Sequence, residues 1–294
     1  MKILNFGSLN YDYVYSVDHI LLPGETSAAW RMETFVGGKG LNQSVALARA
    51  GAEVWHAGQV GEEGEELLHL CRENGVHTEY IRRVPGKSGH TVIQVDKKGQ
   101  NNILLFGGAN RSIPEDYADE VLAAFGEGDL LLLQNEINGI PRLIDRAYAR
   151  GMRIVLNPSP YDEVIGECDL SKVSVLLINE IEGWQISGQR EPDAILDDLV
   201  KTHPELAVVL TLGSQGVVYR HKDEHFSHGV YSVPVVDTTA AGDTFTGYFL
   251  AAITRGGSVP QALELASKAS SIAVTRRGAA PSIPLLREVQ SYAF

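Results

Sequence analysis

Short apolar runs alternate with helix-like patterns through the middle of the chain. Four runs rich in branched residues lie at 130–133, 153–156, 175–178 and 208–210. Between them, residues 141–150 and 193–201 have apolar side chains at the wider spacing of helices. This alternation predicts a parallel sheet with helices on both faces. Because such sheets bind ligands beyond the carboxyl ends of their strands, the loops that follow strands are the first candidates for a site.

A second region departs from this rhythm. Residues 91–95 and 102–106 are strand-like, and the five residues 96–100 between them have the composition of a hairpin turn. With residues 11–15 and roughly 29–36, this hairpin could form a small separate sheet. The pattern fits two interpretations equally, an edge hairpin of the main sheet or a lid over a substrate.

Length and charge narrow the possible functions. A chain of 294 residues with 44% hydrophobic side chains can bury one large core, so we expect one main domain. A formal net charge of −12 disfavours nucleic-acid or anionic-membrane partners, which require clustered Lys and Arg. An anionic ligand would then be held by local hydrogen-bond donors.

The cysteines, the N-terminus and the length of the apolar runs indicate the cellular compartment. Cys71 and Cys168 lie far apart and show no spacing typical of a zinc site or a redox motif, so we expect two reduced core thiols. The N-terminus turns polar too early for a signal peptide, and no apolar run approaches the length of a membrane span. We therefore expect a cytoplasmic protein.

The most informative segment is 235–247, with the sequence VVDTTAAGDTFTG. It predicts a strand that leads through small residues into a helix with Asp243 in its first turn. Small residues let backbone N–H groups approach an anion, and the N-terminus of a helix favours negative charge. A carboxylate there can accept the proton of an attacking hydroxyl. The alternative is that Asp243 is only a helix N-cap.

This segment resembles the C-terminal signature of the PfkB/ribokinase family of carbohydrate kinases, a Gly-Asp pair that opens a helix. Residues 36–43, VGGKGLNQ, are similar to the other signature of that family, about two hundred residues earlier. The resemblance covers nearly the whole chain. It implies an α/β fold, a three-layer α/β/α sandwich with a mainly parallel sheet. It also implies one kinase domain over 1–294, with lid segments at approximately 11–36 and 88–107.

The resemblance implies a sugar site on the N-terminal side. Asp12 follows the first strand, where the family binds sugar hydroxyls, and Glu136 matches the family's sugar-contacting glutamate. At Glu136, a polar residue that only caps its loop is an equally simple reading. The implied sugar-binding residues are Asn10, Asp12, Gly38, Lys39, Asn42, Glu136 and Asp243.

Two further motifs imply a nucleotide site. Asn179 and Glu182 are similar to the family's Asn-x-x-Glu motif, in which the glutamate holds Mg²⁺ through water. Residues 213–216 resemble its Gly-Ser-x-Gly turn, which offers backbone N–H groups to phosphates. The implied nucleotide-binding residues are Asn179, Thr211, Gly213, Ser214, Gly216, Gly242 and Ser267.

Residues 273–282 resemble the ribokinase segment that surrounds a monovalent cation, and Gly278 suits the irregular backbone that such a site needs. The alternative is a tight exit from a helix. The resemblance implies potassium activation. The implied cation ligands are Asp237, Thr239, Ala273, Arg276, Gly278 and Ser282.

Together these matches imply transfer of the γ-phosphate of ATP to a primary sugar hydroxyl, with O5 of ribose favoured. Asp243 would be the base, and the amides of Ala240, Ala241 and Gly242 would stabilise the transferred group. The family also implies a homodimer through the lid. Leu41 replaces the usual Ala, and Ser267 the usual Asn or His, so another small sugar or a nucleoside stays possible. A catalytically silent sugar-binding regulator is the alternative of another class.

Overall fold

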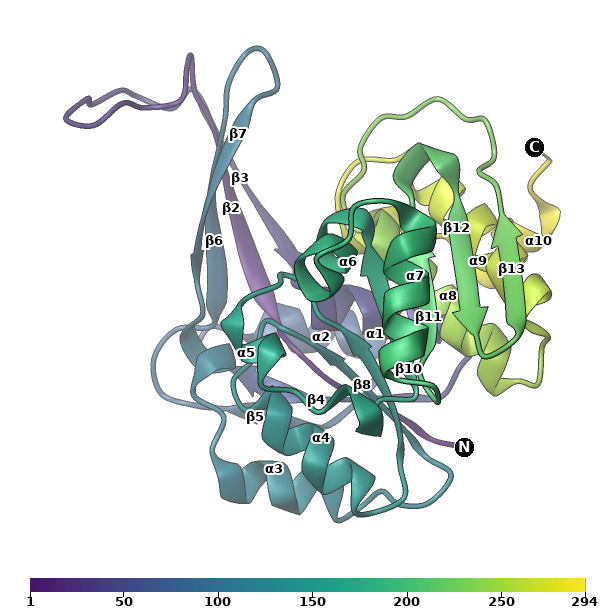
Figure 1. Cartoon of the computed structure of the whole chain (residues 1–294). Helices are drawn as coiled ribbons and strands as arrows, with labels where there is room; N and C mark the ends of the chain where they lie inside the picture. Colours follow the sequence, from purple (N-terminus) through teal and green to yellow (C-terminus); the bar gives the residue numbers. More distant parts are fainter. Residues whose placement is uncertain (294) are drawn as a thin grey trace.

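The computed structural model describes residues 1–293, and its centre is a nine-stranded sheet (Figure 1). In spatial order the strands are β13 (Glu224–His228), β12 (Val217–His221), β11 (Ala207–Thr211), β10 (Val175–Asn179), β9 (Arg153–Asn157), β8 (Leu130–Gln134), β1 (Ile3–Phe6), β4 (Val54–Val60) and β5 (His77–Arg83). All neighbours from β11 to β5 are parallel, whereas β12 and β13 form an antiparallel edge. The predicted parallel sheet is confirmed.

Helices cover both faces of this sheet. One face carries α1 (Lys39–Arg49), α2 (Glu65–Glu73), α8 (Ala241–Thr254), α9 (Val259–Ala273) and α10 (Leu286–Ser291). The other carries α3 (Glu115–Leu122), α4 (Ile140–Tyr148), α5 (Glu163–Gly166), α6 (Glu180–Ser187) and α7 (Pro192–Thr202). Alternate strand residues serve opposite faces: Leu130 and Leu132 enter one core, and Leu131 and Leu133 the other. None of these helices, within residues 1–293, is long and apolar enough to cross a bilayer.

A second, four-stranded sheet projects from the main body beside the carboxyl ends of the central strands (Figure 1). Its order is β3 (Arg31–Gly37), β2 (Asn10–Ser16), β6 (Gly89–Val95) and β7 (Asn101–Phe106). The predicted hairpin is present as β6 and β7, but it pairs with β2 and not with the main sheet. The separate-sheet interpretation is therefore correct, and the edge-hairpin alternative is wrong.

Glycines bring α1 and α8 close to each other and to β1. A Cβ at Gly247 of α8 would lie 2.4 Å from the Cβ of Ala46 in α1, and one at Gly40 would lie 2.3 Å from the backbone nitrogen of Ser8. Only glycine permits such backbone approach. The N-termini of both helices consequently meet at the carboxyl end of β1.

Both cysteines are free and buried, as the sequence predicts. Burial disfavours the thiolate and raises the pKa of Cys71 and of Cys168 to about 12. Each behaves as a small apolar core residue.

Candidate active site

The loops after the central strands enclose a polar cavity of about 260 Å³. Residues from the ends of β9, β10 and β11 form one side, and the start of α8 forms the other. Its lining residues are Lys39, Asn157, Ser159, Leu177, Ile178, Asn179, Glu182, Thr211, Thr238, Ala240, Ala241, Gly242, Asp243 and Thr246. The two sequence signatures, far apart in the chain, thus meet in one cavity.

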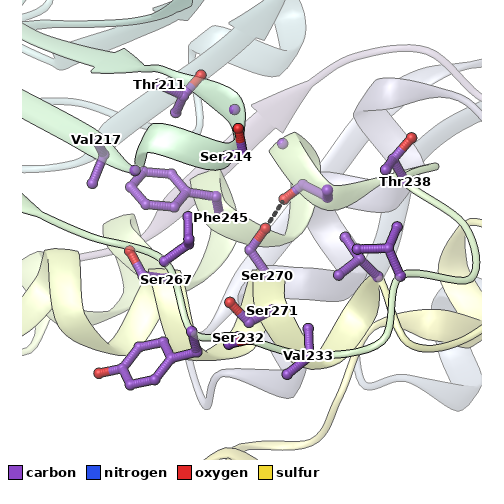
Figure 2. A pocket seen from close by; sticks show the side chains of 18 residues that line it. Thr211, Ser214, Val217, Ser232, Val233, Thr238, Phe245, Ser267, Ser270 and Ser271 are labelled. Carbon is purple, nitrogen blue, oxygen red and sulfur yellow. Dashed lines mark hydrogen bonds between the residues drawn. The ribbon is translucent and has the colours of Figure 1, made fainter.

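A larger and more apolar cavity of about 480 Å³ adjoins the first (Figure 2). Thr211, Thr238, Ala241 and Gly242 line both. The rest of the lining combines the turn after β11, the segment 230–235 and the facing sides of α8 and α9. Those residues are Gly213, Ser214, Gly216, Val217, Val230, Tyr231, Ser232, Val233, Val235, Phe245, Ser267, Ser270, Ser271 and Val274. An apolar cleft beside a polar one suits a flat base joined to phosphates.

Helix α8 presents free backbone donors to the polar cavity. Its N-cap is Ala240, a non-glycine residue in the left-handed region at φ +59°. The amide of Ala241 donates to the carbonyl of Thr238 at 3.2 Å, so this amide is not free for the anion role expected from the sequence. The amides of Gly242 and Asp243 have no hydrogen-bond partner within residues 1–293. Unpartnered N–H groups at the start of a 14-residue helix form an anion site.

The carboxylate of Asp243 is held between two side-chain amides. Nδ2 of Asn42 donates to Oδ2 at 3.0 Å, and Nε2 of Gln43 donates to Oδ1 at 2.9 Å. The side chain makes no capping hydrogen bond to α8, so the cap-only interpretation is wrong. Although Asp243 is only 8% exposed, it lines the polar cavity and so keeps a route to a ligand.

Lys39 supplies the cationic charge of the polar cavity. Burial alone would lower the pKa of Lys39, but the carboxylates of Asp243, Glu136 and Glu182 outweigh that cost and raise it. The ammonium group is therefore charged at neutral pH. A charged lysine beside unpartnered helix amides is a combination suited to phosphate.

The predicted sugar residues Asp12 and Glu136 both have perturbed titration. Burial raises the pKa of Asp12, and the hydroxyl of Thr91 opposes this by donating to Oδ1 at 2.5 Å. Burial also raises the pKa of Glu136, against the opposing effects of Lys39 and Ser8. Oε2 of Glu136 accepts from the Ser8 hydroxyl and from the backbone N–H of Lys39, the latter at 3.0 Å. Glu136 thus ties its loop to α1 while facing Lys39, so the capping interpretation remains as good as the ligand interpretation.

Asn10 and Gly38 lie at the base of the small sheet. Asn10 is buried, and its Oδ1 accepts from Nδ2 of Asn110 at 2.7 Å. Gly38 has φ +95°, and a Cβ there would lie 3.0 Å from the backbone nitrogen of Asn10. The glycine turn therefore fits closely against β2.

Of the residues predicted to bind nucleotide or Mg²⁺, Asn179 and Glu182 form a capping box at α6. The side chain of Asn179 accepts from the N–H of Glu182 at 2.9 Å, and Oε2 of Glu182 accepts from the N–H of Asn179 at 3.0 Å. Within residues 1–293, Oε1 of Glu182 makes no hydrogen bond. The turn that follows β11 needs glycine at Gly216, where φ is +101° and a Cβ would lie 2.2 Å from the carbonyl oxygen of His228.

Ser267 lines the apolar cavity, as Figure 2 shows, together with neighbours from α9. In the same view the hydroxyl of Ser270 points to the carbonyl of Ala241, with a hydrogen bond of 3.0 Å. Leu41, the other departure from the family pattern, lies fully buried in the core and lines neither cavity. Of the two departures, only Ser267 lines one of these two cavities.

The predicted cation ligands lie on two loops that are tied together. Asp237 accepts from the N–H and hydroxyl of Thr239 through Oδ1, and from the N–H of Gly278 through Oδ2 at 2.9 Å. Burial opposes ionisation of Asp237, but these hydrogen bonds outweigh it and lower the pKa. The guanidinium of Arg276 pairs with Glu288 at 3.2 Å, and the hydroxyl of Ser282 donates to the carbonyl of Ala279. Arg276, whose side chain is itself a cation, has only its one backbone carbonyl to offer a bound cation.

Sequence reasoning missed several residues of the site. It assigned no role to Gln43, although Gln43 stands inside the glycine signature, nor to Ser8, Thr91 and Asn157. It also missed the segment 230–235, which lines the apolar cavity from irregular backbone. The position of Gln43 beside Asn42 was the one available signal, because two consecutive amides in a helix that begins at a ligand loop are unusual for core positions.

Comparison with known proteins decides the family. Residues 1–286 match the model of the pfkB family carbohydrate kinases. The chain belongs to this family. It is 33% identical over 297 residues to a ribokinase of Haemophilus influenzae, a match that covers 97% of this chain and 96% of the relative. It is also 27% identical over 306 residues to a deoxyribokinase of Salmonella typhi, covering 99% and 98% of the two chains.

Solved structures give the same picture of the fold. The structure of Arabidopsis thaliana ribokinase complexed with ribose and ATP superposes with a TM-score of 0.88 at 29% identity, and the match covers 99% of each chain. The chain is therefore a PfkB carbohydrate kinase with the ribokinase fold. Identity near 30% does not fix its substrate, since ribokinases and a deoxyribokinase are both similar to it.

Proposed function

We propose that this PfkB kinase transfers the γ-phosphate of ATP to a primary hydroxyl of a sugar, with O5 of ribose as the favoured acceptor. One observation carries the proposal. A carboxylate, Asp243, stands beside the unpartnered amides of a helix N-terminus, in a polar cavity that adjoins an apolar one. The match to ribokinases over nearly the full chain supports the choice of sugar.

The arrangement supports direct in-line transfer. Asp243 accepts the proton as the sugar oxygen attacks phosphorus, and ADP leaves with the electron pair of the broken bond. The N–H groups of Gly242 and Asp243 and the ammonium of Lys39 stabilise the charge on the transferred phosphoryl group. We assign the adenine to the apolar cavity beside Ser267 and the triphosphate to the turn at 213–216.

The sugar lies, in this proposal, between the glycine turn and the small sheet. Asp12 and Asn10 from β2 and Glu136 from the loop after β8 would accept or donate to its hydroxyls, with Gly38, Lys39 and Asn42 beneath it. Because both signatures contribute to this one site, we regard residues 1–294 as a single kinase domain. Use of ATP in sugar metabolism agrees with a cytoplasmic location.

The residues present also fit the two metal ions of the proposal. Oε1 of Glu182 is left by the capping box to hold a water of Mg²⁺, and Mg²⁺ would neutralise phosphate oxygens. The ionised Asp237, Thr239 and irregular backbone at 273–282 fit a monovalent cation, probed best with K⁺. Bound there, it would stabilise the loop that leads into α8.

A phosphorylation screen tests the acceptor. ADP release would be measured with ribose, 2-deoxyribose, other pentoses, hexoses and nucleosides, and product would be identified by mass spectrometry. We expect the highest kcat/KM with ribose. A preference for 2-deoxyribose or a nucleoside would change the proposed acceptor but leave the proposed kinase activity in place. Sugar binding by calorimetry without ADP release for any acceptor would support a silent regulator.

The cation assignment predicts salt-specific activity. Replacement of K⁺ by tetramethylammonium at equal ionic strength is expected to lower kcat severalfold without unfolding the protein, because carbonyl sites select on size. Steady-state rates and a melting curve in each buffer measure this. Equal rates in the two buffers would contradict the site at Asp237.

We also propose that the small sheets of two copies form a homodimer. All six residues of β7 are exposed, including Ile103, Leu104 and Phe106, and β7 is an edge strand with free pairing groups. Leu104→Glu is expected to convert a dimer into a monomer in sedimentation velocity, because a buried charge opposes association. Leu285→Glu, on an exposed apolar residue elsewhere, is the matched control. A wild type that sediments as a monomer at micromolar concentration would overturn the proposal.

A further inference from the structure

A chain of buried side-chain amides leads from the core to Asp243. Gln43 is fully buried, and besides Asp243 its Nε2 contacts Oδ1 of Asn157 at 2.9 Å. On its other side, Nε2 of Gln134 donates to Oε1 of Gln43 at 2.7 Å and to Oδ1 of Asn5 at 2.9 Å. These residues come from α1, β9, β8 and β1, so the chain crosses the centre of the sheet.

A backbone carbonyl fixes the direction of every amide in this chain. Nδ2 of Asn5 donates to the carbonyl oxygen of Gly40 at 2.7 Å, so Oδ1 of Asn5 faces the other way. Gln134 must therefore turn its N–H group to Asn5, and that same N–H group meets Oε1 of Gln43. Gln43 is left with only one orientation, with its N–H group on Asp243.

The far end of the chain carries no charge. Nδ2 of Asn5 also donates to the hydroxyl of Ser44 at 2.8 Å, which contacts Nδ1 of His56 at 2.8 Å. Burial lowers the pKa of His56 to about 4, so its ring is neutral at neutral pH. Within residues 1–293, Asp243 is then the one acidic side chain that this chain of amides contacts.

We infer that Gln43 is a positioning residue for the proposed base: by donating to Oδ1, it holds the Asp243 carboxylate in one rotamer. Nδ2 of Asn42 donates to Oδ2 of Asp243, and Nε2 of Gln43 donates to Oδ1. A carboxylate has about four lone-pair sites, so two amide donors leave acceptor capacity for the sugar hydroxyl. This inference rests on the proposed base role of Asp243.

Substitutions at Gln43 separate this role from a packing role. Gln43→Met removes the donor at similar volume, and Gln43→Glu keeps the shape but sets a second carboxyl group against Asp243. Loss of a donor raises a carboxyl pKa, and a neighbouring carboxylate raises it further. The acid limb of kcat/KM against pH should move upward by about one pH unit in Gln43→Met and by more in Gln43→Glu. If Gln43 served only for packing, Gln43→Met would perturb the protein more than Gln43→Glu, because glutamate is the closer match in shape.

Other charged groups near Asp243 also affect the pH dependence of kcat/KM, and their effect must be distinguished from that of Asp243. They are Lys39 of α1 and Glu136 of the loop after β8, and Glu182 of α6 acts on Lys39. Carbon-13 NMR of aspartate-labelled protein follows Asp243 itself, with Asp243→Asn to assign its carboxyl signal. This readout needs no turnover, so it stands even if no tested sugar is a substrate.

The expected result is an Asp243 titration that moves upward in the order wild type, Gln43→Met, Gln43→Glu, with the acid limb of kcat/KM moving in the same order. The control is Gln59→Leu, which removes another buried glutamine outside the chain of amides and should leave the titration unchanged. If Gln43→Met does not fold, Gln43→Glu alone decides. An Asp243 titration identical to wild type in Gln43→Glu overturns the inference.

Discussion

Replacement of Asp243 by asparagine is expected to lower kcat by about 10²–10⁴, the usual contribution of a general base. Asparagine keeps the size of the side chain but cannot take the proton of the attacking hydroxyl. The amides of Gly242 and Asp243 and the ammonium of Lys39 remain, so ATP and sugar should still bind. Steady-state kinetics and calorimetry with each substrate measure the two effects separately.

The substitution also changes the contacts of residue 243, and the control must account for this. Asp243 accepts from the N–H groups of Asn42 and Gln43. In Asp243→Asn, the new NH2 group would face one of these two donors, and that hydrogen bond would be lost. Asp193→Asn is the matched control, because Asp193 lies in the first turn of α7, exposed and outside both cavities. Turnover of Asp243→Asn within a factor of about three of wild type would remove Asp243 from the base role.

The main sheet could be predicted from the sequence because its strands are buried on both faces. Such strands read as continuous apolar runs, and the four runs at 130–133, 153–156, 175–178 and 208–210 all became parallel strands. The attachment of the small hairpin could not be predicted in this way. Its partner β2 lies some eighty residues earlier, and local composition contains no information on so distant a pairing.

Some residues of the candidate site could likewise be predicted from the sequence, and others could not. Glycine and aspartate at the start of α8 are local signals, since a close backbone approach and a helix N-terminus have sequence signatures. The contact between Asp12 and Thr91 depends on the register of β2 against β6, and the contact between Gln43 and Gln134 depends on packing of α1 over β8. An isolated amide inside an apolar run shows no periodicity, so sequence patterns do not reveal its partner.

Loss of the Asp12 carboxylate is expected to act on the sugar and not on ATP. Oδ1 of Asp12 already accepts from Thr91, so Oδ2 is the oxygen most available to a sugar hydroxyl. A hydrogen bond to a charged group contributes about 1.5–3 kcal/mol, so kcat/KM for the sugar should fall about ten- to a hundredfold in Asp12→Ala. The KM for ATP should hardly change.

Deoxy sugars and a second variant make this test specific. A sugar that lacks the hydroxyl bound by Asp12 should be a poor substrate for wild type and should lose little further on mutation. Thr91→Val keeps the shape at position 91 and removes its donor, which leaves a less restrained carboxylate. We expect a smaller loss in Thr91→Val than in Asp12→Ala, with the same bias toward the sugar.

Thermal stability distinguishes a ligand from a loop cap at Asp12. Burial raises the pKa of Asp12, so the folded protein gains little stability from its ionised form, and its removal should not lower Tm greatly. Asp12 would be a structural cap if the Asp12→Ala variant melted at a much lower temperature than the Thr91→Val variant and if its sugar and ATP kinetics were impaired equally. Unchanged sugar kinetics with impaired ATP kinetics would place the sugar elsewhere, because β2 would then face the nucleotide and not the acceptor.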